Sequence, residues 1–290
     1  MANCQFLTCS VQHVEFFHKD HFEYRYHRKK AKSSLSKYID FFWETDFETL
    51  WNQHPDGFSD ALFRNIGYTY LINLGTPFVM QLEDEKFEIK SDAFLPRCKN
   101  MICHHSAGNK IFGIKFRVSP IVFEKKINFF EYREFIYPLA YLIDRKIIEK
   151  IKAAESFAKR VEVISAYYDR IIEKHENSLK HVSVVTAALD ALERSNFKLS
   201  IEAIAEENKI STRTLQRYFE ATTSISTKQA FQIMRIRRAI EKLATDPAGF
   251  DHHDFGYYDY SHFYKQLKDF INSHSISVTE PHLQLLKGNS

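Results

Sequence analysis

Side chains that can hydrogen-bond to nucleic-acid bases gather on one short segment in the C-terminal third of the chain. Ser211 can cap a helix there, and the helical spacing buries Leu215 while three side chains face outward: Arg213, Gln216 and Arg217. Arginine and glutamine pair with guanine and adenine edges in the major groove. The chemistry indicated is recognition of double-stranded DNA by hydrogen bonding, without catalysis.

A shorter helix just before this segment would support it. Ser200 suits its N-cap, Ile204 and Ala205 would face inward, and Asn208 suits a left-handed residue in the turn that ends it. Two short helices with a small residue at their crossing form a helix-turn-helix. An ordinary helical corner has the same spacing, so these residues alone leave both interpretations open.

A longer helix is predicted over 229–244, and it carries a local basic cluster of Arg235, Arg237 and Arg238. Arginines of this kind hold DNA phosphates or simply solvate a helix face. We expect phosphate contacts from these three side chains and from Lys268 on the helix that follows.

A second aromatic-rich segment comes after Gly256, which suits a turn. A helix that begins near Asp259 would bury Phe263 and Leu267. Its outward face would then carry five candidate DNA contacts: Tyr260, Ser261, His262, Tyr264 and Lys265. The C-terminal region therefore divides into two structural halves.

The order of these motifs is similar to that of the AraC/XylS family of bacterial transcription regulators. The match runs over 199–283 and includes Leu-Ser-Ile-x-x-Ile-Ala, Ser-x-Arg-x-Leu-Gln-Arg-Tyr-Phe and Gly-Tyr-Tyr-Asp-x-Ser-His-Phe-x-Lys-x-Leu-Lys. The resemblance implies two helix-turn-helix units joined by a long helix, with recognition helices in successive major-groove turns about 34 Å apart. It also implies that the two outward faces described above read bases, and that RNA polymerase is a partner.

The sequence departs from that family at two places. Thr223-Ser224-Ile225 stands where a glycine is usual after the first recognition helix. In the second unit, an acidic segment over 248–254 replaces the usual apolar helix, so we expect a truncated or irregular supporting helix. Acidic side chains there also repel phosphate. The first unit is therefore the stronger candidate for base reading.

The N-terminal half alternates apolar and polar residues, which is typical of strands with one buried face. Tyr68, Tyr70 and Ile72 alternate in one run, and further runs follow over 78–82 and 112–118. Several short strands of this kind predict a small β-barrel or sandwich. Three segments resemble a sensor-like domain found on some AraC-type regulators, with a small-molecule effector as a candidate partner: 38–44, 55–57 and 113–117.

Helical spacing replaces the alternation after Pro138. A stripe from Phe157 to Ile171 predicts an amphipathic helix with Ser156 as its N-cap, and 143–154 is also helical in period. The helix pair either lies on the barrel or forms a dimerisation seam. Both alternatives stay open here, and a homodimer is a candidate assembly.

We therefore predict an α+β, two-domain chain. Residues 1–135 would form a β-rich sensor-like domain (a small β-barrel or sandwich), 136–180 helices that link the domains and are candidates for dimerisation, and 181–290 an all-α, DNA-binding double helix-turn-helix domain. The 290 residues include no apolar run of membrane-spanning length and no secretory start, so we expect a cytoplasmic protein without membrane contact. The net charge of +3 does not suggest nucleic acid, and the prediction depends on where the charges lie.

The motif Cys98-x4-Cys103-His104-His105 invites a metal site. Neighbours on a strand face opposite sides, so at most alternate members could share a metal, and the spacing is not that of a structural zinc site. We predict no metal, no cofactor and no catalytic residue. The alternatives are a metal-dependent small-barrel enzyme with a degenerate helical tail, and an anti-activator that binds another regulator through the 147–171 region.

Overall fold

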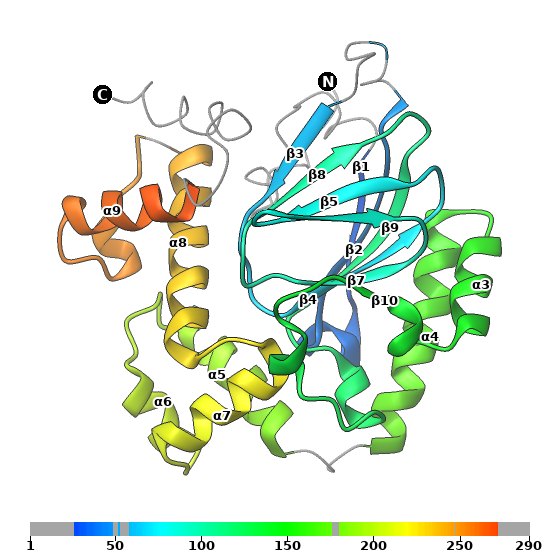
Figure 1. Cartoon of the computed structure of the whole chain (residues 1–290). Coiled ribbons are helices and arrows are strands. Elements are labelled where there is room, and N and C mark those ends of the chain that lie inside the picture. The colour runs from blue at the N-terminus through cyan, green and yellow to red at the C-terminus, as the bar shows by residue number, and fades with distance from the viewer. Residues whose placement is uncertain (1–25, 49–51, 53–57, 176–179, 247, 272–290) are drawn as a thin grey trace, which may run out of the picture.

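A β-rich unit and a helical unit pack against each other in the computed structural model (Figure 1). The structure describes residues 26–48, 52, 58–175, 180–246 and 248–271. The proposed segment 55–57 of the sensor-like resemblance lies outside the described residues.

The β-rich unit contains two antiparallel sheets. The larger has the strand order β1-β2-β9-β4-β7-β10 and the smaller has the order β3-β8-β5-β6. The strands of the larger sheet are β1 (Tyr26–Lys30), β2 (Ile39–Asp46), β9 (Lys110–Phe116), β4 (Tyr68–Asn73), β7 (Ala93–Pro96) and β10 (Tyr137–Pro138). The strands of the smaller sheet are β3 (Phe58–Leu62), β8 (Met101–His105), β5 (Phe78–Leu82) and β6 (Glu85–Ile89).

The two sheets face each other across a shared apolar core. Trp43 and Leu95 from the larger sheet pack in one cluster with Phe78, Met80 and Cys103 from the smaller sheet. The alternation that predicted strands in this region is thus explained by a sandwich, since one face of each strand points into this core.

The outer face of the larger sheet is covered by helix α4 (Phe157–His175), which follows α3 (Arg145–Ala153). Ile164, Tyr168 and Ile171 are buried in the same cluster as Phe112 and Phe116 of β9. The apolar stripe of α4 is therefore buried against the larger sheet of the same chain. Of the two alternatives for the helix pair, the structure shows the one in which the pair lies on the barrel. The apolar stripe of α4 is buried there, so the prediction of a dimerisation seam made by this stripe is wrong.

The helical unit begins with α5 (Lys180–Arg194), α6 (Ile201–Glu207) and α7 (Thr212–Thr223). A 19-residue helix, α8 (Thr227–Thr245), connects this group to the 3-10 turn η6 (His252–Phe255) and to α9 (Tyr260–Ile271). The α+β, two-unit fold class predicted from the sequence is confirmed in these elements. An irregular support for the last helix is also confirmed, because η6 is a single 3-10 turn that buries no residue.

The turn between α6 and α7 differs from the prediction in one residue. Asn208 has a φ of −88°, whereas its neighbour Lys209 has a φ of 54° and takes the left-handed position. Asn208 ends the helix with its side chain instead, because its Nδ2 donates to the carbonyl oxygen of Ile204 at 2.8 Å.

Candidate nucleic-acid interface and inter-domain pocket

Helices α6 and α7 form the helix-turn-helix expected from the sequence. Each begins at a serine whose hydroxyl accepts a backbone N–H: Ser200 from Ala203, and Ser211 from Thr214. This capping satisfies donors that an exposed helix start would otherwise leave to water.

The outward face of α7 carries the three predicted base contacts. Arg213, Gln216 and Arg217 are exposed, while Leu215 and Phe219 on the opposite face are fully buried. The Gln216 amide donates to Glu220 at 2.9 Å, one helical turn away. The two guanidinium groups of this face therefore lie on a capped helix and are accessible to a ligand.

The second outward face lies on α9, and it is richer in aromatic rings. All five predicted contacts on this helix are exposed: Tyr260, Ser261, His262, Tyr264 and Lys265. The rings of Tyr260 and Tyr264 stack with centroids 6.1 Å apart, and the ammonium of the exposed Lys268 lies 4.9 Å from the Tyr264 ring. Tyr258, which the sequence analysis did not single out, is 88% exposed just before the helix. Its position beside α9 in the motif was the signal that could have found it.

The arginines of α8, which were predicted to contact phosphates, make contacts within the protein. Arg237 is only 4% exposed, and its guanidinium donates to the carbonyl oxygen of Arg64 at 3.1 Å. Arg235 lies 4.4 Å from the Tyr257 ring centroid and donates to Gln266 at 3.3 Å. Burial raises the pKa of Tyr257 to about 12, so its hydroxyl stays neutral beside this arginine.

Arg238 also pairs within the protein. It forms ion pairs with Glu241 at 3.0 Å and Glu193 at 3.7 Å. Lys268, the fourth predicted phosphate contact, differs from the three arginines of α8. It is exposed on α9, on the same helix as the five predicted base contacts. The local sequence could not show this difference, because the partners of the α8 arginines come from distant segments.

The last helix is attached to the β-rich unit by a specific set of contacts. The ring of Phe63, which follows β3, stacks on Phe270 of α9 with centroids 5.5 Å apart. Arg64 forms an ion pair with Asp269, and the Asn100 amide donates to the carbonyl oxygen of Phe270 at 2.9 Å. The position of α9 is therefore set by the β-rich unit as well as by α8.

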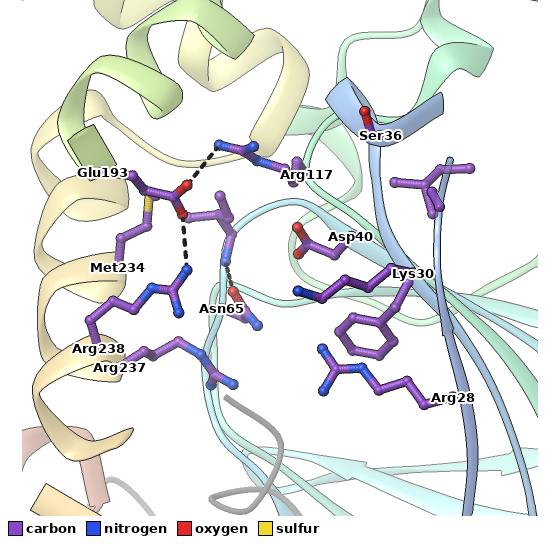
Figure 2. A pocket seen from close by; sticks show the side chains of 14 residues that line it. Arg28, Lys30, Ser36, Asp40, Asn65, Arg117, Glu193, Met234, Arg237 and Arg238 are labelled. Atoms are coloured by element: carbon purple, nitrogen blue, oxygen red, sulfur yellow. Dashed lines mark hydrogen bonds and ion pairs between the residues drawn. The ribbon is translucent and has the colours of Figure 1, made fainter. Parts of the chain in front are cut away.

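A cavity of about 250 Å³ opens between the two units (Figure 2). Its charged lining consists of five cations and two carboxylates: Arg28, Lys30, Arg117, Arg237, Arg238, Asp40 and Glu193. Five positive and two negative charges give the lining a formal charge of +3. Lys30 and Arg28 come from β1 and face the arginines of α8 across the cavity. This arrangement can hold an anion between the two units.

Part of this lining is already neutralised by pairing. Arg117 lies 2.8 Å from Asp190 and 3.7 Å from Glu193, which also contacts Arg238. The pocket was not predictable from the local sequence, because its lining includes residues of β1, α5 and α8, and β1 and α8 lie more than 150 positions apart in the chain. Two local signals were present, the run Arg28-Lys29-Lys30 and the basic cluster of α8, of which Arg237 and Arg238 line the pocket.

The residues of β8 that were considered for a metal site divide between its two faces, with Cys103 and His105 together on one face and His104 on the other. Cys103 is buried between the sheets with its Sγ 3.7 Å from His105 Nδ1. His104 points to the other face, where Ser59 and Gln81 contact its ring at 2.7 and 3.1 Å. Within the described residues, the group with the proximity that a metal needs is a different one, Asp251-His252-His253.

No protein-family model matches the sequence, and no curated protein matches it either. Among solved structures, ToxT from Vibrio cholerae is similar to this chain, with 10% identity and a TM-score of 0.44 over 89% of this chain and 98% of that one. Wild-type ToxT with a bound unsaturated fatty acid has 9% identity and a TM-score of 0.41 over 79% and 95% of the two chains. The AraC-like transcriptional activator CuxR has 11% identity and a TM-score of 0.29 over 77% and 90%. Likenesses this distant carry no inference about function, which depends on the side chains of this chain.

Proposed function

We propose that this chain is a sequence-specific, DNA-binding transcription regulator. The observation that carries the proposal is the exposed face of Arg213, Gln216 and Arg217 on α7, the second helix of a capped helix-turn-helix. These side chains match the donors and acceptors that base edges present in the major groove. The partner of this face is double-stranded DNA.

The length of α8, which lies between the two outward faces along the chain, supports the same proposal. Helix α8 has 19 residues and connects α7 to the segment that carries α9. A helix of this length spans about 28 Å, which is close to one turn of B-DNA. The two faces would then meet successive major-groove turns, with Lys268 on a phosphate.

The test is binding of the full chain to its own upstream DNA, measured by fluorescence anisotropy across a salt titration. Arg217→Ala should weaken binding to the preferred site by about 1–3 kcal/mol and relax one base preference. Arg145→Ala removes the same charge from the exposed start of α3 and is the matched control, with no expected effect.

Two outcomes would count against the proposal. Equal weakening on every sequence would mean that Arg217 contacts only phosphate. A wild-type chain without sequence preference at low salt would remove the regulator hypothesis.

A second part of the proposal concerns the cavity between the units. We infer that it binds a small anion as an effector, because its lining is cationic and joins β1 to α8. Isothermal titration with an unsaturated fatty acid and with inorganic phosphate should give saturable binding for one of the two. Lys30→Ala should weaken that binding, whereas Lys29→Ala, outside the lining, should not.

Two further partners are proposed from this role: RNA polymerase and a second copy of the chain. The proposed site of action is the cytoplasm. Within the described residues, none of the helices has both the length and the apolar character to cross a bilayer. The anti-activator alternative depended on the 147–171 region, where the apolar stripe that includes Ile164, Tyr168 and Ile171 is buried in the core.

A further inference from the structure

Three consecutive side chains just before α9 gather their ligand atoms in one place. We propose that Asp251, His252 and His253 form a binding site for a divalent transition-metal ion, and that the ion orders the segment that leads into α9. The ligand atoms of these residues all lie within 4.8 Å of one another.

The local backbone explains why sequence neighbours converge here. Asp251 caps η6, and its Oδ1 accepts the backbone N–H of His253 at 2.9 Å. The same oxygen lies 2.8 Å from His253 Nδ1 and 3.6 Å from His252 Nδ1. The two imidazole rings lie side by side with centroids 4.0 Å apart. On a strand these neighbours would point to opposite sides, whereas the tight turn places them together.

The donor set favours a late transition metal. Two imidazole nitrogens and a carboxylate suit zinc, nickel or copper, while magnesium and calcium prefer oxygen ligands alone. Ligand atoms at about 2.1 Å from a tetrahedral ion lie about 3.4 Å apart. His253 and Asp251 are exposed, so their side chains can rotate toward that spacing. Open positions would be filled by water.

Two half-buried rings hold this segment: Phe250 and Phe255 stack with centroids 5.9 Å apart and pack against the core cluster that contains Phe263. Turn η6 buries no side chain, and the buried core resumes at Tyr257. The ring of His252 contacts the ring of Tyr260, the first residue of α9, edge to face with centroids 5.9 Å apart. A metal that fixes His252 therefore fixes the start of the helix that carries the second outward face.

Charge gives a further reason for a cation at this place, and this step depends on the proposed DNA-binding function. Asp251, Asp254 and Asp259 are exposed in the segment that leads into α9. Carboxylates at that position repel DNA phosphates. A divalent ion on Asp251 would lower this repulsion.

The first experiment measures Zn²⁺ binding to the full-length, EDTA-treated chain by competition with a chromogenic chelator. We expect His252→Ala/His253→Ala to lose one zinc equivalent, or to bind it at least about tenfold more weakly. His27→Ala, which removes an exposed histidine from β1, is the control and should behave like the wild type. Unchanged zinc binding in the double variant would overturn the site. Equal far-ultraviolet circular dichroism without metal would show that the variant is folded.

Hydrogen exchange separates this proposal from the DNA-binding function. Zn²⁺ should slow amide exchange over 252–264 in the wild type but not in the double variant, whether or not DNA is bound. If zinc binds but amide exchange over 252–264 stays unchanged, the proposal that the ion orders the segment leading into α9 is wrong. DNA affinity that rises with Zn²⁺ only in the wild type would support the charge effect, whereas loss of all DNA binding would contradict the proposed function and leave the zinc result intact.

Discussion

At the scale of single residues, the conformation of Lys209 has a measurable consequence. This exposed residue takes a φ of 54° in the turn of the helix-turn-helix. A left-handed backbone costs a residue with a Cβ roughly 1–2 kcal/mol, and glycine avoids that cost but is more flexible when unfolded. Lys209→Gly should therefore raise the free energy of unfolding by about 0.5–1 kcal/mol. Urea denaturation followed by circular dichroism measures the change.

The matched control for this position is Lys209→Ala. It removes the same charge and keeps the Cβ, so it should leave the stability close to that of the wild type. A glycine variant no more stable than the alanine variant would mean that the turn has no backbone strain to relieve.

At the scale of elements, the pairing of β2 and β9 depends on a glycine opposite a tryptophan. Trp43 and Gly113 are partners in the register of these strands. A Cβ on Gly113 would lie 2.0 Å from the Trp43 indole, which leaves no room for it. Gly113→Ala should therefore lower the free energy of unfolding by about 1–3 kcal/mol, since the core must shift to admit the methyl group. Urea denaturation measures the change in stability, and a shift of the tryptophan fluorescence in a Trp51→Phe background, where Trp43 is the remaining tryptophan, reports the displacement.

A double-mutant cycle identifies the cause of that loss. Gly113→Ala should cost less in a Trp43→Leu background, because the smaller side chain leaves space for the methyl group. The same cost in both backgrounds would show that the indole is not what excludes a side chain at this position.

At the scale of the whole molecule, Arg237 joins the helical unit to the β-rich unit. Its buried guanidinium contacts the carbonyl oxygens of Phe63 and Arg64, beside the Phe63–Phe270 stack. Arg237→Ala should lower the free energy of unfolding by about 1–3 kcal/mol, because the hydrogen bonds are lost and a cavity remains. Hydrogen exchange of α9 should also become faster. Arg238→Ala on the same helix removes a more exposed guanidinium and should cost less than about 1 kcal/mol. Equal effects of the two variants would contradict a special role for Arg237.

The periodic parts of this fold were accessible from the sequence. The helix over 229–244 and the strand over 78–82 are present as α8 and β5 with nearly the same bounds. Ser200 and Ser211 cap the helices they were expected to cap. These features depend on interactions among residues a few positions apart, so the local pattern carries them.

The sequence alone determined the outward faces of α7 and α9, because helical spacing decides which side chains a short amphipathic helix can bury. Only the tertiary structure decided the roles of the α8 arginines and the existence of the cationic pocket. Arg237 and Lys30 both belong to basic runs of the sequence and both line the cavity, yet Arg237 is buried and bonded to the Phe63 carbonyl oxygen, whereas Lys30 is exposed. The groups that surround these side chains come from segments more than 150 residues away in the chain. A charged side chain can be buried at the interface only where a distant carbonyl oxygen accepts its hydrogen bond, and otherwise it stays on the surface.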